Sequence, residues 1–146
     1  MKYLKFSPII IVLAFLLYYS SPSDQLSEQS ADAEQKQWES KTDDRPPVTV
    51  KVTPVEFGQD AQTWKFRIVL DTHSGSLDDN LLRVAVLTDD KGKVYEPVAW
   101  EGAEPGGHHR EGVLMFNAVQ PMPESIEIKI KNVGGVPERS FAWSLK

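Results

Sequence analysis

Three histidines are the residues of this chain best suited to bind a transition metal. They are His73, His108 and His109, and imidazole nitrogens bind zinc or copper, with a carboxylate or water completing the shell. Adjacent residues of an extended chain point to opposite sides. His108 and His109 therefore hold one ion together only if the Gly106-Gly107 turn bends the backbone, and we expect one of them to join His73 instead. The alternative is that one histidine hydrogen-bonds loop backbone and the others are solvated.

A second group of candidate ligands consists of oxygen donors close in sequence. Asp71, Asp78, Asp79 and Asn80 are residue types that calcium prefers, but their spacing does not match the EF-hand loop. We expect a solvated acidic loop with Asx turns in preference to a calcium site.

Catalytic arrangements find little support. Ser74 and Ser76 lie near histidines and aspartates, but neither is framed by a Gly-x-Ser-x-Gly elbow. No pair of carboxylates is singled out for sugar hydrolysis, and the absence of cysteine excludes a thiol nucleophile and disulfides. We therefore expect a protein that is not an enzyme, with a hydrolase as a distant alternative.

Two Arg-Glu neighbours share the loops that carry this chemistry. Arg110-Glu111 and Glu138-Arg139 have the charges to pair across neighbouring loops. Exposed pairs would contribute little to stability, whereas partly buried pairs would pin two loops together. We expect loop pinning or partner contact from these four residues and from Asp71.

The elements that must position these residues are strands, because apolar side chains alternate with polar ones from Val48 onward. No stretch of ten residues in this region has a helical period. The pattern yields seven strand candidates, which predict an all-β, immunoglobulin-like antiparallel β-sandwich over 48–146, with a small open barrel as the alternative. The expected inward residues are Val48, Val50 and Val52; Trp64, Phe66, Ile68 and Leu70; Leu82, Val84 and Val86; Val94, Val98 and Trp100; Leu114, Phe116 and Ala118; Ile126, Ile128 and Ile130; and Phe141, Trp143 and Leu145.

Strand parity predicts which loops lie together. If every strand crosses the domain once, the loops after strands two, four and six share one end, and these are Asp71–Asn80, Glu101–Gly112 and Asn132–Ser140. They hold all three histidines, and functional residues tend to lie on loops held by a rigid frame. The first strand begins at the same end. We therefore expect the preceding chain to enter there, with the histidines nearer the membrane than the C-terminus is.

The N-terminal region predicts an attachment to the membrane. Residues 9–19 are uninterruptedly apolar and follow Lys2 and Lys5, which favours a signal-anchor over 1–19 with the rest of the chain on the extracytoplasmic side. Residues 20–47 are rich in Ser, Gln, Asp and Glu, so we expect a disordered polar tether. The alternative is a cleaved signal peptide and a secreted domain.

Charge limits the classes of partner. The net charge is -5 and no part of the chain is a basic block, so we expect no nucleic-acid partner. A protein partner at or near the membrane remains as the expected one.

Three loop strings also resemble those of a set of small uncharacterised exported bacterial β-sandwich domains. They are Asp71-Thr72-His73-Ser74, the Gly106–Gly112 string GGHHREG, and the Gly134–Arg139 string GGVPER followed by Phe141-Ala142-Trp143. The resemblance covers about residues 48–146. It implies that the three loops belong together, and it carries no established activity or ligand.

Together these observations predict a membrane-tethered extracytoplasmic binding or accessory domain, with zinc or copper as the candidate ion at a histidine-bearing rim. The alternative is a structural protein-interaction module, or an accessory subunit of a membrane or cell-surface complex, without bound metal. Converging imidazole nitrogens would favour the first hypothesis, and histidines hydrogen-bonded within their own loops would favour the second.

Overall fold

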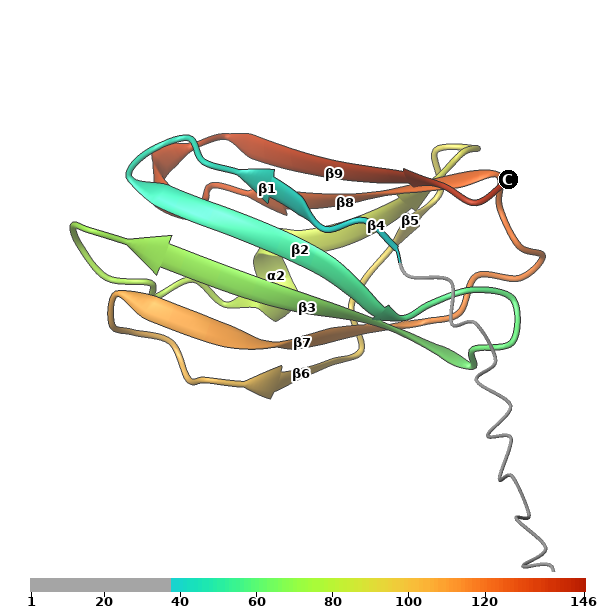
Figure 1. The fold of residues 1–146 in the computed structure, drawn as a ribbon, viewed down its shortest axis with the longest axis horizontal. Helices are drawn as coiled ribbons and strands as arrows, with labels where there is room; N and C mark the ends of the chain where they lie inside the picture. Colours follow the sequence, from blue (N-terminus) through green and yellow to red (C-terminus); the bar gives the residue numbers. More distant parts are fainter. Residues whose placement is uncertain (1–37) are drawn as a thin grey trace, which may run out of the picture. The chain divides into compact units, whose positions relative to one another are not determined.

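The computed structural model describes residues 38–146, which form two antiparallel sheets and almost no helix (Figure 1). One sheet has the order β1-β2-β3-β7-β6 and the other β5-β4-β8-β9. The predicted anchor over 1–19 and most of the predicted tether lie outside the described residues. No helix within residues 38–146 is long and apolar enough to span a membrane. The strands are β1 (Lys41–Asp43), β2 (Val48–Glu56), β3 (Thr63–Thr72), β4 (Ala85–Asp89), β5 (Val94–Tyr95), β6 (Ala99–Gly102), β7 (His109–Asn117), β8 (Ser125–Lys131) and β9 (Glu138–Ser144).

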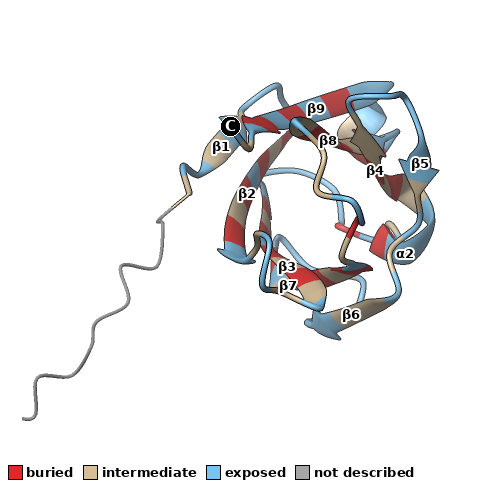
Figure 2. Cartoon of the chain, turned by 90° about the vertical axis from the view of Figure 1, so that its right-hand side faces the viewer, coloured by how far each residue is buried: buried red, intermediate tan, exposed pale blue. Residues whose placement is uncertain are grey.

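The core lies between the two sheets, where the inward side chains of both meet. Buried and exposed residues alternate along the long strands, as the banded colouring of Figure 2 shows. Trp64, Phe66 and Phe116 are buried as expected, and the rings of Phe66 and Phe116 make a T-shaped contact. Trp100, which we expected in the core, is only half-buried. Period-two alternation therefore identified most of the core.

One expected strand is two strands in the structure. The candidate running from Val94 to Trp100 divides into β5, which pairs with β4, and β6, which pairs with β7. The chain crosses from one sheet to the other between them, and both short strands run antiparallel to their partners. Because β5 and β6 keep the same direction, the crossing does not change the end at which the following loop lies.

The third expected strand begins later than predicted and in the opposite phase. Asn80 accepts a hydrogen bond from the Leu82 amide through its side chain and begins a single helical turn, α2 (Leu81–Val84). This turn exposes Leu82 and buries Leu81. The strand that follows then buries Ala85 and Leu87, and the expected inward position of Val86 is wrong because the helical turn shifts the alternation by one residue.

The predicted tether is too long at its C-terminal end, because Lys41–Asp43 form β1. This strand pairs antiparallel with β2, with Lys41 opposite Val52 and Asp43 opposite Val50. Trp38, the first described residue, contacts the ring of Phe57 just beyond the end of β2, with 4.9 Å between ring centroids. The described chain therefore begins at the end opposite to the one expected, since one additional strand reverses the parity of the entry point.

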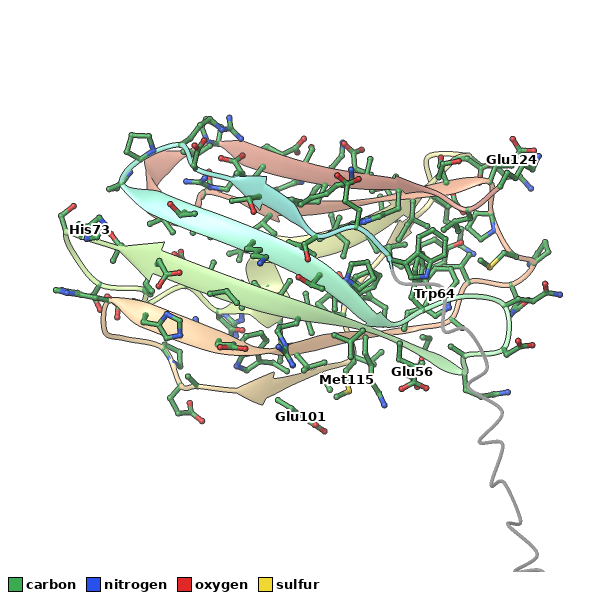
Figure 3. The ribbon with its side chains drawn as sticks, in the orientation of Figure 1. Glu56, Trp64, His73, Glu101, Met115 and Glu124 are labelled. Carbon is green, nitrogen blue, oxygen red and sulfur yellow. The ribbon has the colours of Figure 1, made fainter. Side chains whose placement is uncertain are left out.

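The grouping of the three loops at one end is confirmed. The loops after β3, β6 and β8 lie at one end of the sheets, and the loops after β2, β4 and β7 lie at the other. Figure 3 shows His73 at the first end and Glu124 at the second. The C-terminus lies at the second end too, where the Leu145 amide donates to the Glu124 carbonyl oxygen.

Candidate functional site

The end that carries the histidines consists of four loops, which we call the loop end: residues 44–47, 73–80, 103–108 and 132–137. Two of these loops are joined by backbone hydrogen bonds. The Leu77 amide donates to the Gly107 carbonyl oxygen at 3.1 Å, and the Gly106 amide donates to the Leu77 carbonyl oxygen at 2.9 Å. The side chain of Leu77 is buried in the core, so these bonds hold both loops on a fixed support.

Arg110 pins the same two loops from inside the domain. Its side chain is 2 % exposed, and its guanidinium donates to the carbonyl oxygens of Ala103, Leu77 and Asp79 at 3.0, 3.5 and 2.5 Å. Burial lowers the pKa of Arg110, because desolvation disfavours its charged form. The buried guanidinium thus supplies hydrogen bonds to carbonyl groups of two loops that lie outside the sheet ladders.

The Arg110 guanidinium also lies over the ring of Trp100, 5.2 Å from its centroid. The Trp100 indole has room there because glycines occupy two facing positions, Gly102 and Gly112. A Cβ added at Gly112 would lie 2.6 Å from the Trp100 ring and 2.7 Å from the Glu101 carbonyl oxygen. The glycine pair therefore makes the cation–π contact possible.

Arg139 has the corresponding role at the other two loops. It is fully buried, and it donates to Asp43 Oδ1 at 2.6 Å, to the Arg45 carbonyl oxygen at 2.9 Å and to the Val133 carbonyl oxygen at 3.4 Å. Its Nε is the one buried side-chain nitrogen or oxygen of the described residues without a hydrogen-bond partner. These contacts join the β1–β2 turn to the loop before β9.

Arg110 and Arg139 thus have the contacts of loop-pinning residues, but not with the expected partners. Neither pairs with a glutamate of the other loop. The signal for their burial was present in the sequence, since Arg139 is in phase with Phe141 and Trp143 along β9, and Arg110 is in phase with Leu114 along β7. Each strand therefore points its arginine inward, and the loop carbonyl groups meet it there.

The neighbours of the two arginines point outward, because successive side chains of a strand alternate between faces. Glu111 is exposed and lies 3.6 Å from the Arg67 guanidinium on the neighbouring strand. Glu138 is exposed as well, and its carboxylate lies 3.5 Å from Lys129. Both glutamates therefore form surface pairs, which contribute little to stability.

His109 lies on the outer face of the larger sheet, opposite Asp71 across the β3–β7 pair. Its Nδ1 is 2.6 Å from Asp71 Oδ1, and its Nε2 is 3.8 Å from Glu111 Oε2. The hydrogen bond that His109 donates to Asp71, and then the charges of Asp71 and Glu111, raise the pKa of His109 above its usual value of 6.5. The carboxylates thus favour the protonated imidazolium, which cannot bind a metal.

The other two histidines are exposed at the tips of their loops. The His108 carbonyl oxygen accepts from the Thr72 amide at 2.9 Å, so the backbone before His73 and that of His108 lie side by side. Across residues 38–146, no three side chains of His, Cys, Asp or Glu are arranged to hold a metal ion. The three histidines are therefore at one end of the domain without forming one ligand set.

The residues that we considered as calcium ligands make local hydrogen bonds instead. Asp78 accepts from the Ser76 hydroxyl at 2.7 Å, and the Asn80 side chain caps α2. The Asp79 carbonyl oxygen binds Arg110, while Asp71 binds His109 on the outer face. These are the turn and cap roles that aspartate and asparagine commonly have.

At the opposite end, a hollow of about 330 Å³ lies between the β4–β5 turn and the loop before β8. Its carboxylates are already engaged. Asp89 accepts from the amides of Lys91 and Lys93 and from the Tyr95 hydroxyl, and Glu124 pairs with the terminal Lys146. This hollow therefore offers no convergent set of unpaired polar groups.

The loop end is thus a fixed surface of four loops, held by two buried arginines and bearing exposed imidazoles. Comparison of the chain with protein-family models, with curated proteins and with solved structures finds no match.

Proposed function

We propose that residues 38–146 are an immunoglobulin-like β-sandwich with one additional strand at its N-terminus. Support comes from the strand order. If β2 to β9 are labelled A, B, C, C′, D, E, F and G, the sheets read A-B-E-D and C′-C-F-G, which is the arrangement of immunoglobulin domains with a C′ strand. β1 then pairs with strand A from outside.

We further propose that the protein is an extracytoplasmic interaction module without enzymatic activity, attached to the membrane by its N-terminal apolar segment. The observation that carries this proposal is the pinning of the loop end by Arg110 and Arg139. Loops held in one conformation lose little entropy on binding, so they suit recognition of another protein. The described chain begins at the other end of the domain from the loop end.

The geometry favours this module over the metal-binding alternative. The His109 side chain is hydrogen-bonded to Asp71 on the neighbouring strand, and across residues 38–146 no three candidate ligands are arranged around one point. Both observations support the module. Zinc or copper titrated into the chain should show no stoichiometric complex at micromolar concentration. A one-to-one complex at that concentration that is lost in His73→Ala would instead support a metal site at the loop end.

Single-cysteine labelling tests the extracytoplasmic location, and the chain has no cysteine that would interfere. Ser74→Cys places a label at the loop end, and Asp60→Cys places one at the opposite end. A membrane-impermeant maleimide should label both variants in intact cells. Labelling only after lysis would contradict the proposal.

A further inference from the structure

The two flanks of the domain, where the edges of the sheets meet, are closed to different degrees. On one flank, β1 joins the sheets, because it pairs with β2 while the Glu39 carbonyl oxygen accepts from the Trp143 indole of β9 at 2.8 Å. On the other flank, the edge strands are β5 and β6, and α2 lies beside β6 (Figure 2). We call this second side the open flank, defined by residues 81–84 and 94–104.

The open flank carries most of the large apolar side chains that the described residues expose. Four such side chains are exposed in residues 38–146, and Leu82, Val94 and Val98 of the open flank are three of them, with exposed fractions of 41, 58 and 52 %. The fourth, Val55, lies at the end of β2. Leu82 belongs to α2, Val94 to β5 and Val98 to the segment before β6, so the exposed apolar side chains come from the three elements that line this flank, and exposed apolar patches commonly mark sites for other proteins.

The edge of β6 has backbone groups available for a further strand. The Ala103 amide donates to the Glu111 carbonyl oxygen of β7 at 3.0 Å, in register with the β6–β7 pairs, and amide directions alternate along a strand. The amides of Trp100 and Gly102 therefore point away from β7, toward the outside of the sheet. β6 contains neither lysine nor proline, the residues that commonly protect exposed edges.

The charge of the open flank is mostly negative. Glu96, Glu101 and Glu104 are exposed along residues 94–104, and Arg83 is the one base of the flank. Figure 3 shows Glu101 projecting outward from β6. A strand that pairs with β6 would place its side chains beside these glutamates, where lysine or arginine is favoured and acidic residues are repelled.

We infer that the open flank docks an extended segment of a partner protein, which adds a strand at the β6 edge. Its apolar side chains lie over Val98, and its basic side chains face Glu101 and Glu104. Main-chain hydrogen bonds supply affinity in this mode of recognition, and the side chains supply specificity. This surface adjoins the loop end at residues 103–104 and extends along β6 away from it.

The test uses the full chain in nanodiscs of neutral lipid with a nine-residue peptide of alternating lysine and valine. The peptide should slow hydrogen exchange at the amides of Trp100 and Gly102 and leave β1, the other edge strand of the same sheet, unchanged. A matched peptide of alternating glutamate and valine should give no protection. In Glu101→Lys/Glu104→Lys, the affinity for the lysine peptide should fall about tenfold, whereas Glu138→Lys on β9 should change it less than twofold.

Tryptophan fluorescence and circular dichroism establish that each variant is folded. Three results would overturn the proposal: no binding at millimolar peptide, protection outside the open flank, or equal affinity in the doubly reversed variant. Protection of β6 in the free chain that rises with protein concentration would identify a second copy as the occupant, and would also overturn it. None of these outcomes depends on whether the loop end binds a partner.

Discussion

The guanidinium of Arg139 in β9 donates to the carboxylate of Asp43 in β1, with 2.6 Å between Nη1 and Oδ1 and 96 positions between the residues in sequence. The Arg139 side chain is fully buried, and the Asp43 side chain is 13 % exposed. This contact joins β1, which pairs with β2 in one sheet, to β9 of the other sheet. β1 is thereby tied to the loop before β9, which belongs to the loop end.

Asp43→Ala should destabilise the domain by about 3–5 kcal/mol, because it leaves a buried guanidinium without its carboxylate. Asp44→Ala, an exposed neighbour, is the matched control and should change stability by less than about 0.5 kcal/mol. Urea unfolding followed by tryptophan fluorescence measures both. Equal stability of the two variants would show that Arg139 finds its acceptors without Asp43.

The same carboxylate predicts a loss of stability in acid. The hydrogen bond from Arg45, helped by the charge of Arg139, lowers the pKa of Asp43 from 3.8 to about 2. A lowered pKa stabilises the folded state above the unfolded-state value, and this contribution is lost as the pH falls from about 4 to about 2. It amounts to about 2 kcal/mol. The difference in stability between the native chain and Asp43→Asn should therefore shrink over that window, and a constant difference would contradict the assignment.

Arg110→Met should loosen the loop end while the sheets stay intact. The variant keeps an apolar side chain against Trp100 but removes the donors to the loop carbonyl groups. The amides of Leu77 and Gly106, which bond across the two loops, should exchange with solvent at least tenfold faster. Arg67→Met on the outer face, where Arg67 is exposed, should leave them unchanged. Unaltered exchange in Arg110→Met would mean that the backbone bonds hold the loops alone.

His109 should titrate above pH 6.5, because Asp71 raises the pKa of His109. Asp71→Asn should return it toward 6.5, which a proton NMR titration of the imidazole resonances measures. A raised folded-state pKa stabilises the fold below the unfolded-state value, and this contribution is lost as the pH rises through the raised pKa. A pKa of His109 unaffected by Asp71→Asn would rule out the hydrogen bond in solution.

Trp64→Ala should cost about 3–5 kcal/mol, because Trp64 is fully buried in the core and its removal leaves a cavity. Trp100→Ala is the matched control, since Trp100 is only half-buried at the open flank. Its cost should be clearly smaller. Thermal unfolding of the two variants decides the ranking, and a greater loss in Trp100→Ala would place the centre of stability at the open flank.

Much of the core follows from the sequence alone, because alternation in a strand is a local property. The inward positions of β3 and β8, such as Phe66 and Ile128, need no knowledge of the partner strands. The grouping of the three loops at one end was also predictable. It depends only on the number and direction of the crossings, and the division of one expected strand into β5 and β6 changed neither.

Other features were set by contacts between residues far apart in sequence. β1 has no apolar side chain, so no alternation marks it, and it is a strand because β2 and Arg139 hold it there. Strand alternation predicts that Arg110 and Arg139 point inward, but the sequence does not show which carbonyl groups would surround a buried arginine. His109 faces outward because its neighbour Arg110 takes the inward position.

The end at which the described chain begins shows the same division. Counting strands from Val48 placed the entry at the loop end, and this was wrong because β1 adds one crossing before β2. Local alternation determines which side chains of a strand face the core. The pairing of a short polar segment such as β1 depends on the free edge of β2 and on the buried guanidinium of Arg139. Only the tertiary structure brings these two features together.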